Sequence, residues 1–247
     1  MQQILKEIIQ WVRAILKKTF HRDNPSFSYY LTLVVSFVIF VTCMNIFVEI
    51  TEDLRENELE HFDAIYTERI QSLRNPSRTV FFQFVTELGD RLTYILLSLG
   101  IALFFYLRFG NWKFTLQTII VLILSSFSNL ILKRVINRER PDLEHLVAVS
   151  TLSYPSGHAM SAMAFYGFLI YLSFRFKLSL LFRSFIVILL GILILLIGVS
   201  RIYLGVHFPS DVLAGFFGGL IWVTFCIIVF NVVDLYRKRK NYISFRS

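Results

Sequence analysis

Long apolar runs separated by short polar segments dominate the pattern of this sequence. A helix needs about 20 mainly apolar residues to cross a bilayer, and six runs reach or approach that length. The pattern therefore predicts an all-α, polytopic membrane protein with six transmembrane helices. We expect these helices at residues 29–50, 92–107, 114–132, 157–174, 182–199 and 212–233.

Residues 1–28 have a different pattern. Seven apolar residues fall on one face of a helix, and basic residues occupy the rest of its circumference, which favours an amphipathic helix lying in the cytoplasmic interface. A helix that docks on a partner protein fits the same pattern. A cleaved signal peptide does not, because charges interrupt the apolar stretch. The apolar face comprises Ile4, Leu5, Ile8, Ile9, Val12, Ile15 and Leu16.

The charges support the membrane reading and predict its orientation. Apolar residues make up 55% of the chain, against about 45–50% in soluble domains. The net charge of +8 comes from basic residues that the apolar runs divide into groups, so we favour positive-inside topology over nucleic-acid binding. These groups lie in residues 1–28, in the tail 234–247 and in the second and fourth connections. An even number of spans places both termini in the cytoplasm of a cell (plasma) membrane protein.

The connection from residue 51 to 90 is acidic and lies on the opposite, outer side in this topology. Its apolar residues recur at near-helical spacing until Asn75-Pro76 breaks the pattern, so we expect short helices over the outer interface. Loops of this length are often lids or binding loops, although a plain connector is an alternative. No linker or repeat interrupts residues 29–233, which we interpret as one six-span domain.

Three short motifs lie at the ends of the predicted spans. With six spans, the end of the third, the start of the fourth, the end of the fifth and the start of the sixth all emerge on the outer face. Residues 133–141, 155–158 and 200–211 hold these four positions. The segmentation alone therefore predicts that motifs far apart in the chain converge on one outward-facing site.

Three cations in these motifs predict a phosphate site. Lys133, Arg140 and Arg201 lie at membrane depth or just beyond it, where unpaired cations are costly and usually functional. Arg suits bidentate contacts with phosphate oxygens, whereas Lys acts as a point charge. Lys133 alone would fit a residue that extends its amine toward the interface from a helix end.

The run Pro155-Ser156-Gly157-His158 precedes the fourth span. Ser156 fits a helix cap, and Gly157 allows the backbone to approach a ligand closely. Free amides at a helix start attract anions, so His158 would lie beside the phosphate. A histidine at a membrane interface without a chemical role is the alternative.

His207 and Asp211 complete the candidate site. A carboxylate four residues away would fix the imidazole and free its other nitrogen for attack, and Asp211 would also suit the start of the sixth helix. A phosphohistidine would form at His207, and His158 would protonate the departing oxygen and then activate water. We find no cluster of residues suited to a metal, so we expect neither a metal nor another cofactor.

These motifs resemble the signature of the type-2 phosphatidic acid phosphatase superfamily. The pattern Lys-x6-Arg-Pro, Pro-Ser-Gly-His, Ser-Arg-x5-His-x3-Asp is filled at every position, from Lys133 to Asp211. The resemblance implies a six-helix membrane fold, an extracytoplasmic site and metal-independent dephosphorylation. It implies His207 as nucleophile, Asp211 as its orienting residue and His158 as general acid. The phosphate would bind to Lys133, Arg140, Ser156, Gly157 and Arg201, with Arg138 as an accessory residue.

The leading hypothesis is thus an enzyme that hydrolyses a lipid phosphate or pyrophosphate in the bilayer. Undecaprenyl pyrophosphate, phosphatidylglycerol phosphate and phosphatidic acid all fit a cationic, outward-facing pocket. A binding or transport protein that does not catalyse is one alternative. A vanadium haloperoxidase is another alternative, because these enzymes carry similar motifs. They are soluble and larger, however, so the six predicted spans argue against this alternative.

Overall fold

The computed structural model describes residues 27–149 and 151–244, and every regular element in them is an α-helix. This confirms the all-α class. The interfacial helix predicted for residues 1–28 falls, up to residue 26, outside the described residues. The helices are α2 (Phe27–Arg55), α3 (Glu60–Gln71), α4 (Pro76–Glu87), α5 (Arg91–Phe109), α6 (Lys113–Ile136), α7 (Gly157–Arg175), α8 (Leu180–Tyr203) and α9 (Pro209–Ser244).

Five described helices, α2, α5, α6, α8 and α9, are long and apolar enough to cross a membrane. They coincide with five of the six predicted runs. The remaining run is α7, which has a suitable length but opens with Gly157-His158 and buries nine of its residues against neighbouring helices. A helix enclosed by protein has less need of apolar side chains than one that faces lipid. The count of six spans stays a prediction.

The helices continue past the apolar runs. The predicted spans end at residues 132 and 199, but α6 and α8 run to Ile136 and Tyr203. Lys133 and Arg201 therefore lie within the last helical turns, where a cation is favoured by the negative end of the helix dipole.

The described residues group into two compact units. Residues 27–41 and 224–244 form one, in which the rings of Phe40 and Phe225 lie 6.2 Å apart. Residues 42–223 form the other and hold every candidate site residue. The site can therefore be described within this second unit alone.

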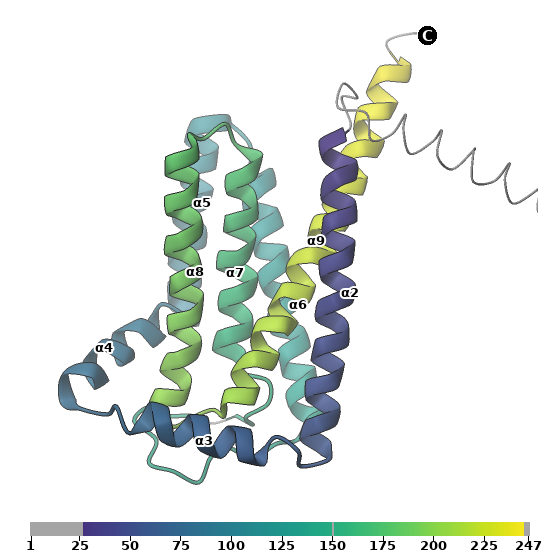
Figure 1. Ribbon diagram of the computed structural model, residues 1–247. Helices are drawn as coiled ribbons and strands as arrows, with labels where there is room; N and C mark the ends of the chain where they lie inside the picture. Colours follow the sequence, from purple (N-terminus) through teal and green to yellow (C-terminus); the bar gives the residue numbers. More distant parts are fainter. Residues whose placement is uncertain (1–26, 150, 245–247) are drawn as a thin grey trace, which may run out of the picture. The chain divides into compact units, whose positions relative to one another are not determined.

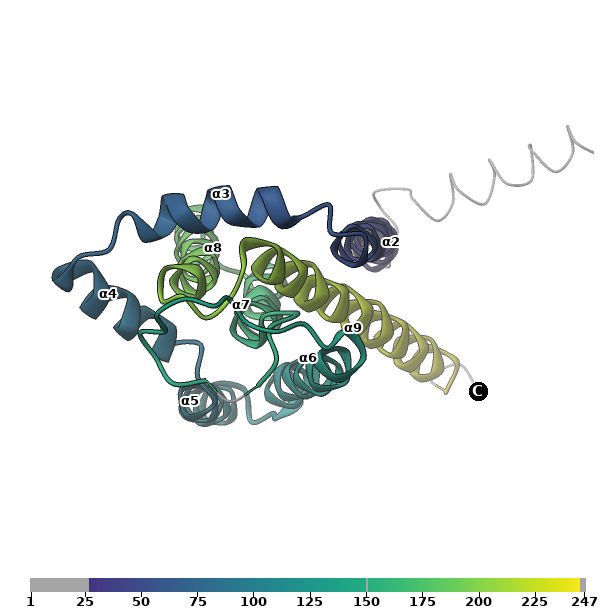
Figure 2. The same ribbon diagram turned by 90° about the horizontal axis from the view of Figure 1, so that it is seen from below.

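In the second unit, α5, α6, α7 and α8 run side by side, and α3 and α4 lie across one end of them (Figure 1). Seen along the bundle, α7 lies between its neighbours (Figure 2). It packs against α6 and α8, and α8 also packs against α3 and α4. The crossing helices α3 and α4 are therefore seated on the bundle at the end where α8 finishes.

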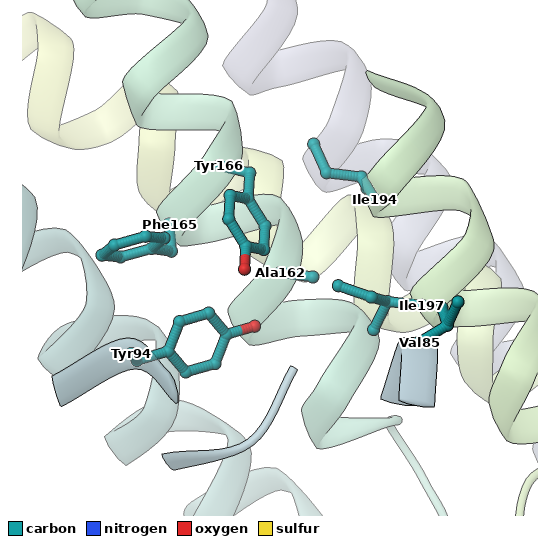
Figure 3. Close-up of a cluster of buried hydrophobic side chains, with 7 residues drawn as sticks. All are labelled: Val85, Tyr94, Ala162, Phe165, Tyr166, Ile194 and Ile197. Carbon is teal, nitrogen blue, oxygen red and sulfur yellow. The ribbon is translucent and has the colours of Figure 1, made fainter. Parts of the chain in front are cut away.

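A buried cluster joins this end of the bundle to α4 and α5 (Figure 3). Tyr94 of α5 packs on Phe165 of α7, with ring centroids 5.1 Å apart. Between helices in a bilayer, close van der Waals packing rather than exclusion of water favours association, so the cluster holds α4 and α5 against α7 and α8. Its members are Val85, Tyr94, Ala162, Phe165, Tyr166, Ile194 and Ile197.

The predicted break at Asn75-Pro76 is confirmed as the boundary between α3 and α4. The Asn75 side chain accepts a hydrogen bond from the Arg78 amide at 2.8 Å, and Pro76 begins α4, where a missing amide hydrogen costs nothing. Arg74 donates to the Tyr203 carbonyl at 2.9 Å. The segment between α2 and α5 is thus a pair of anchored helices rather than a plain connector.

Candidate active site

The three sequence motifs meet at one end of the second unit. The ends of α6 and α8 and the starts of α7 and α9 lie there, beside α3 (Figures 1 and 2). The predicted convergence on one end is confirmed. The side of the membrane that this end faces stays a prediction.

His207 and Asp211 are paired and buried. His207 Nδ1 lies 3.4 Å from Asp211 Oδ2, and their side chains are 2% and 0% exposed. The same carboxylate oxygen accepts a hydrogen bond from the Phe208 amide at 2.9 Å. Pro209 begins α9, so Asp211 lies at the helix start as predicted, where it both contacts the imidazole and satisfies an amide.

Ser153, which the sequence analysis missed, completes this pair. Its hydroxyl donates to Asp211 Oδ2 and lies 3.3 Å from His207 Nδ1. Because the Ser153 hydroxyl donates its proton to Asp211 Oδ2, the two oxygens near His207 Nδ1, Ser153 Oγ and Asp211 Oδ2, can only accept a hydrogen bond from it. Nδ1 therefore carries the imidazole proton, and Nε2 keeps the lone pair.

Arg138 lies between two carboxylates. One guanidinium nitrogen, Nη1, is 2.7 Å from Asp211 Oδ1, and Nη2 is 2.7 Å from Asp63 Oδ2. Asp63 comes from α3 and also accepts hydrogen bonds from Ser210, from its amide at 2.9 Å and from its hydroxyl at 2.6 Å. The residue expected as an accessory phosphate ligand thus binds Asp211 on the side away from His207.

The neutral form of His207 is favoured by its surroundings. Burial lowers the pKa of the imidazole to about 3, and the charges of Arg201 and Arg140 act in the same direction. The hydrogen bond and charge of Asp211 oppose them and raise the pKa. A neutral imidazole with its lone pair on Nε2 is the form in which histidine attacks an electrophile.

Lys133 and Arg140 gather on the carbonyls of the loop before α7. Lys133 Nζ donates to the carbonyls of Leu152 and Ser153. Arg140 donates to the Thr151 carbonyl at 2.6 Å and the Leu152 carbonyl at 3.5 Å, and its Nη1 lies 3.4 Å from His207 Nε2. Arg140 therefore lies beside the free nitrogen of the candidate nucleophile, and Lys133 binds the same loop.

Arg201 reaches the site from the last turn of α8. Its side chain is buried, its Nη1 donates to Thr86 Oγ1 at 2.7 Å, and its Nε has no hydrogen-bond partner within the described residues. Within the same residues, neither Arg201, Lys133 nor Arg140 forms a salt bridge with a carboxylate. Three cations without a carboxylate partner, one with an unsatisfied donor, are suited to hold an anion.

The Pro-Ser-Gly-His run begins α7 as predicted. Ser156 caps the helix by accepting from the Ala159 amide at 3.5 Å, and its own amide donates to the Asp211 carbonyl at 2.9 Å. Asn129 of α6 holds the run by donating to the Pro155 carbonyl at 3.0 Å. A Cβ atom at Gly157 would lie only 3.1 Å from Asn129 Oδ1, so glycine at this position leaves room for the Asn129 side chain that bonds the Pro155 carbonyl.

His158 has a partner that the sequence analysis did not identify. Its Nε2 lies 2.7 Å from Asp90 Oδ1, in the turn between α4 and α5. The hydrogen bond from His158 lowers the pKa of Asp90, although partial burial acts against it. Asp63, Thr86 and Asp90 all belong to the long connection, which carried no motif signal.

No group of three or more His, Cys, Asp or Glu side chains in the described residues is arranged to hold a metal ion.

Comparisons with known proteins identify the family of this chain. Residues 114–234 match the model of the PAP2 superfamily. The chain is 33% identical over 175 residues to phosphatidylglycerophosphatase B of Bacillus subtilis, covering 68% of this chain and 83% of that protein. It is 35% identical over 100 residues to lipid A 1-phosphatase of Rhizobium etli, covering 36% and 39% of the two chains.

Two solved structures are also similar. The crystal structure of the PAP2-type phosphatidylglycerolphosphate phosphatase of Bacillus subtilis aligns with a TM-score of 0.71 and 29% identity, covering 78% of this chain and 95% of that one. Aquifex aeolicus LpxE aligns with a TM-score of 0.51 and 27% identity, covering 67% and 92%.

Proposed function

Because the chain belongs to the PAP2 superfamily and is therefore a multi-pass membrane lipid phosphatase, we propose that His207 is its nucleophile and His158 its general acid. The reaction runs through a phosphohistidine and requires no metal. The observation that carries the proposal is the group of Lys133, Arg140 and Arg201, which have no carboxylate partner in the described residues. Arg140 Nη1 lies 3.4 Å from His207 Nε2, and the charges of Arg140 and Arg201 act on both His207 and Lys133.

In the first step, His207 Nε2 forms a bond to phosphorus as the bond from phosphorus to the lipid oxygen breaks. The proton of His158 moves to that oxygen, so the lipid leaves as a neutral alcohol or as a monophosphate. General acid catalysis of this kind contributes about 10²–10⁴-fold to the rate. Asp211 and Ser153 hold the other nitrogen of His207, which keeps its lone pair directed away from them.

In the second step, water attacks the phosphohistidine. Neutral His158 accepts a proton from this water, the nitrogen–phosphorus bond breaks, and phosphate leaves with His207 restored. Lys133, Arg140 and Arg201, with the Ser156 hydroxyl and the Gly157 amide at the start of α7, hold the phosphoryl oxygens in both transition states, because the Ser156 amide is bonded to the Asp211 carbonyl. Positioning and charge stabilisation of this type supply most of the catalysis in phosphoryl transfer.

For the substrate, we propose phosphatidylglycerol phosphate first. The relative that matches the larger part of this chain is a phosphatidylglycerophosphatase, and a solved structure with that activity in its name aligns over most of the fold. Undecaprenyl pyrophosphate and phosphatidic acid present the same phosphate at the end of an apolar chain. In the predicted topology, the site faces the outside of the cell membrane.

The presence of both His207 and His158 favours hydrolysis over the binding or transport role that the sequence left open. The family assignment and the apolar helices likewise favour a lipid phosphatase over a haloperoxidase.

The test is phosphate release by the detergent-purified protein from phosphatidylglycerol phosphate, undecaprenyl pyrophosphate and phosphatidic acid, each with excess EDTA. We expect release that survives EDTA and is lost in His207→Ala. The control is His61→Ala, because His61 is exposed on α3 and outside the site.

Substrate labelled on the phosphate should leave acid-labile label on the protein but not on His207→Ala. Activity abolished by EDTA would contradict the metal-free mechanism. Activity that persists in His207→Ala would contradict the assignment of the nucleophile. Release from all three lipids at equal rates would contradict the proposed preference.

A further inference from the structure

The end of α4 and the turn that joins it to α5, residues 86–90, contact two site residues that lie far away in the sequence. Thr86 Oγ1 accepts from Arg201 Nη1 at 2.7 Å, and Asp90 Oδ1 lies 2.7 Å from His158 Nε2. This segment thus bonds Arg201, a proposed phosphate-binding residue, through Thr86, and it bonds His158, the proposed general acid, through Asp90.

This turn is held rigidly in place. Tyr166 of α7 donates to the Leu88 carbonyl at 2.7 Å, and the Gly89 amide donates to the Thr86 carbonyl at 2.9 Å. Val85, just before the turn, belongs to the buried cluster with Tyr166 (Figure 3). The backbone just before Asp90 is therefore held against α7, which fixes the position of Asp90 beside His158.

Gly89 is what lets the turn approach His158 this closely. A Cβ atom at that residue would lie 2.9 Å from Ile197 Cγ2 and 3.0 Å from His158 Cδ2. Both distances are shorter than carbon atoms ordinarily allow, so a side chain there would push the imidazole away from Asp90.

The charges around His158 come from three elements. Arg201 lies on α8, Arg140 in the loop after α6, and Asp90 in the turn before α5. Two of the three are cations, which oppose a protonated imidazole. Among the described residues, Asp90 is the carboxylate that bonds His158. Its negative charge therefore stabilises the protonated ring against the two arginines.

The bond to Asp90 also decides which nitrogen of His158 is available. Nε2 is committed to the carboxylate, whereas Nδ1 has no hydrogen bond to another described residue. A carboxylate that holds one imidazole nitrogen keeps a proton on it through the reaction, so the other nitrogen does the exchange.

We propose that Asp90 is a positioning residue for His158, which keeps a proton on Nε2 so that Nδ1 serves first as the acid and then as the base. This rests on the proposed function. In the first step, the Nδ1 proton moves to the departing lipid oxygen. In the second, Nδ1 takes a proton from the attacking water, and the imidazolium is restored without a change at Nε2.

The test compares Asp90→Asn with the native enzyme on two leaving groups. Dioctanoyl phosphatidic acid releases an alkoxide that needs a proton, whereas p-nitrophenyl phosphate releases a stable phenolate that does not. We expect Asp90→Asn to lose about tenfold or more in the first step on the lipid, part of the 10²–10⁴-fold that a general acid supplies, and less than threefold on the aryl phosphate. Release of the alcohol or phenolate in a single turnover measures this step, because the second step is common to both substrates. The alkaline limb of its lipid pH–rate profile should move to lower pH.

A double-mutant cycle gives the second readout. In the His158→Ala background, Asp90→Asn should change kcat on the lipid by less than twofold, because its target is gone. Glu87→Gln is the matched control, since Glu87 is exposed at the end of α4, three residues before Asp90, and the substitution removes the same charge. It should retain native rates on both substrates.

The outcomes separate the two proposals. Equal losses on both leaving groups, or additive losses in the cycle, would overturn the role of Asp90 while leaving the phosphatase intact. A native enzyme that releases phosphate from neither lipid nor aryl substrate would instead overturn the proposed function. Thermal unfolding of each variant identifies a loss caused by misfolding.

Discussion

The two histidines of the site are held in opposite ways. His207 is 2% exposed and its Nδ1 is fixed by Asp211, which lies four residues away in the same motif. His158 is 24% exposed and its Nε2 is fixed by Asp90, which is 51% exposed and comes from a distant turn. One ring therefore offers Nε2 and the other offers Nδ1.

The difference follows from what each ring is proposed to do. A nucleophile must keep a bare lone pair, and burial achieves this by making protonation unfavourable. An acid that becomes a base must exchange protons with substrate and water, which partial exposure allows. The nucleophile is thus protected from solvent, whereas the acid is balanced between two arginines and one carboxylate.

The largest test of this contrast is Asp211→Asn. The amide would present a donor to Nδ1 and favour the tautomer with its proton on Nε2, which removes the attacking lone pair. We expect kcat to fall by about 10⁴-fold, as for the equivalent change in a serine protease triad. Phosphate release measures it, with Asp142→Asn in an exposed loop as the control. A fall of less than tenfold would show that His207 needs no orienting carboxylate.

Asp63→Ala tests the support behind the nucleophile. It leaves the Arg138 guanidinium and the Ser210 amide without their partner on α3. Breaking a buried ion pair on one side costs about 3 kcal/mol, so we expect that loss in unfolding free energy and a drop in kcat. Glu60→Ala, on the exposed side of the same helix, should change neither. An unchanged unfolding transition in detergent would mean that α3 contributes nothing to this network.

The burial of His207 predicts a dependence of stability on pH. The unfolded imidazole has a pKa of about 6.5, and burial lowers the folded value to about 3. Between these values the unfolded chain binds the proton and the native protein does not. Its contribution is therefore fully present above pH 6.5 and is lost as pH falls, by about 1.4 kcal/mol per pH unit.

His207→Gln removes this titration. We expect the native enzyme to lose about 2 kcal/mol more than the variant between pH 6.5 and 5.0, measured by unfolding in detergent. Parallel losses in the two proteins would mean that His207 titrates at its ordinary value in the fold.

Ser153→Ala is the mildest of the four changes. The imidazole keeps Asp211 but loses the hydroxyl that lies 3.3 Å from Nδ1. A hydrogen bond of this kind is worth about 1–1.5 kcal/mol, so we expect kcat to fall about tenfold. Ser77→Ala on α4 is the control, being exposed. A loss as large as that of Asp211→Asn would rank the serine equal to the carboxylate.

The sequence alone predicted the helices and the motif residues, because both leave local patterns. Apolar runs marked five helices that are long and apolar enough to span the membrane. The order of these runs predicted that residues 133–141 and 200–211 meet at one end, where Arg140 and Asp211 contact His207. The run at α7 was less apolar because neighbouring helices enclose it.

The partners of those residues could not be predicted in the same way. Asp63, Thr86 and Asp90 are ordinary residues of an acidic connection, and their contacts span 68 to 147 positions in the chain. Only the packing of α3 and α4 on α8 brings them to the motifs. Ser153 lies two residues before a recognised motif, but nothing in its neighbours marked it out.

The family match begins at residue 114, whereas Asp63, Thr86 and Asp90 all precede it. In the proposed mechanism, the signature residues therefore depend on side chains that lie outside the family match. A chimera that exchanged residues 51–90 for those of a relative would retain every signature residue and still depend on the donor for both carboxylates. In the proposed mechanism, the segment that identifies the chemistry and the segment that positions its residues are separate parts of the chain, so we expect that transferring the activity to another protein requires both.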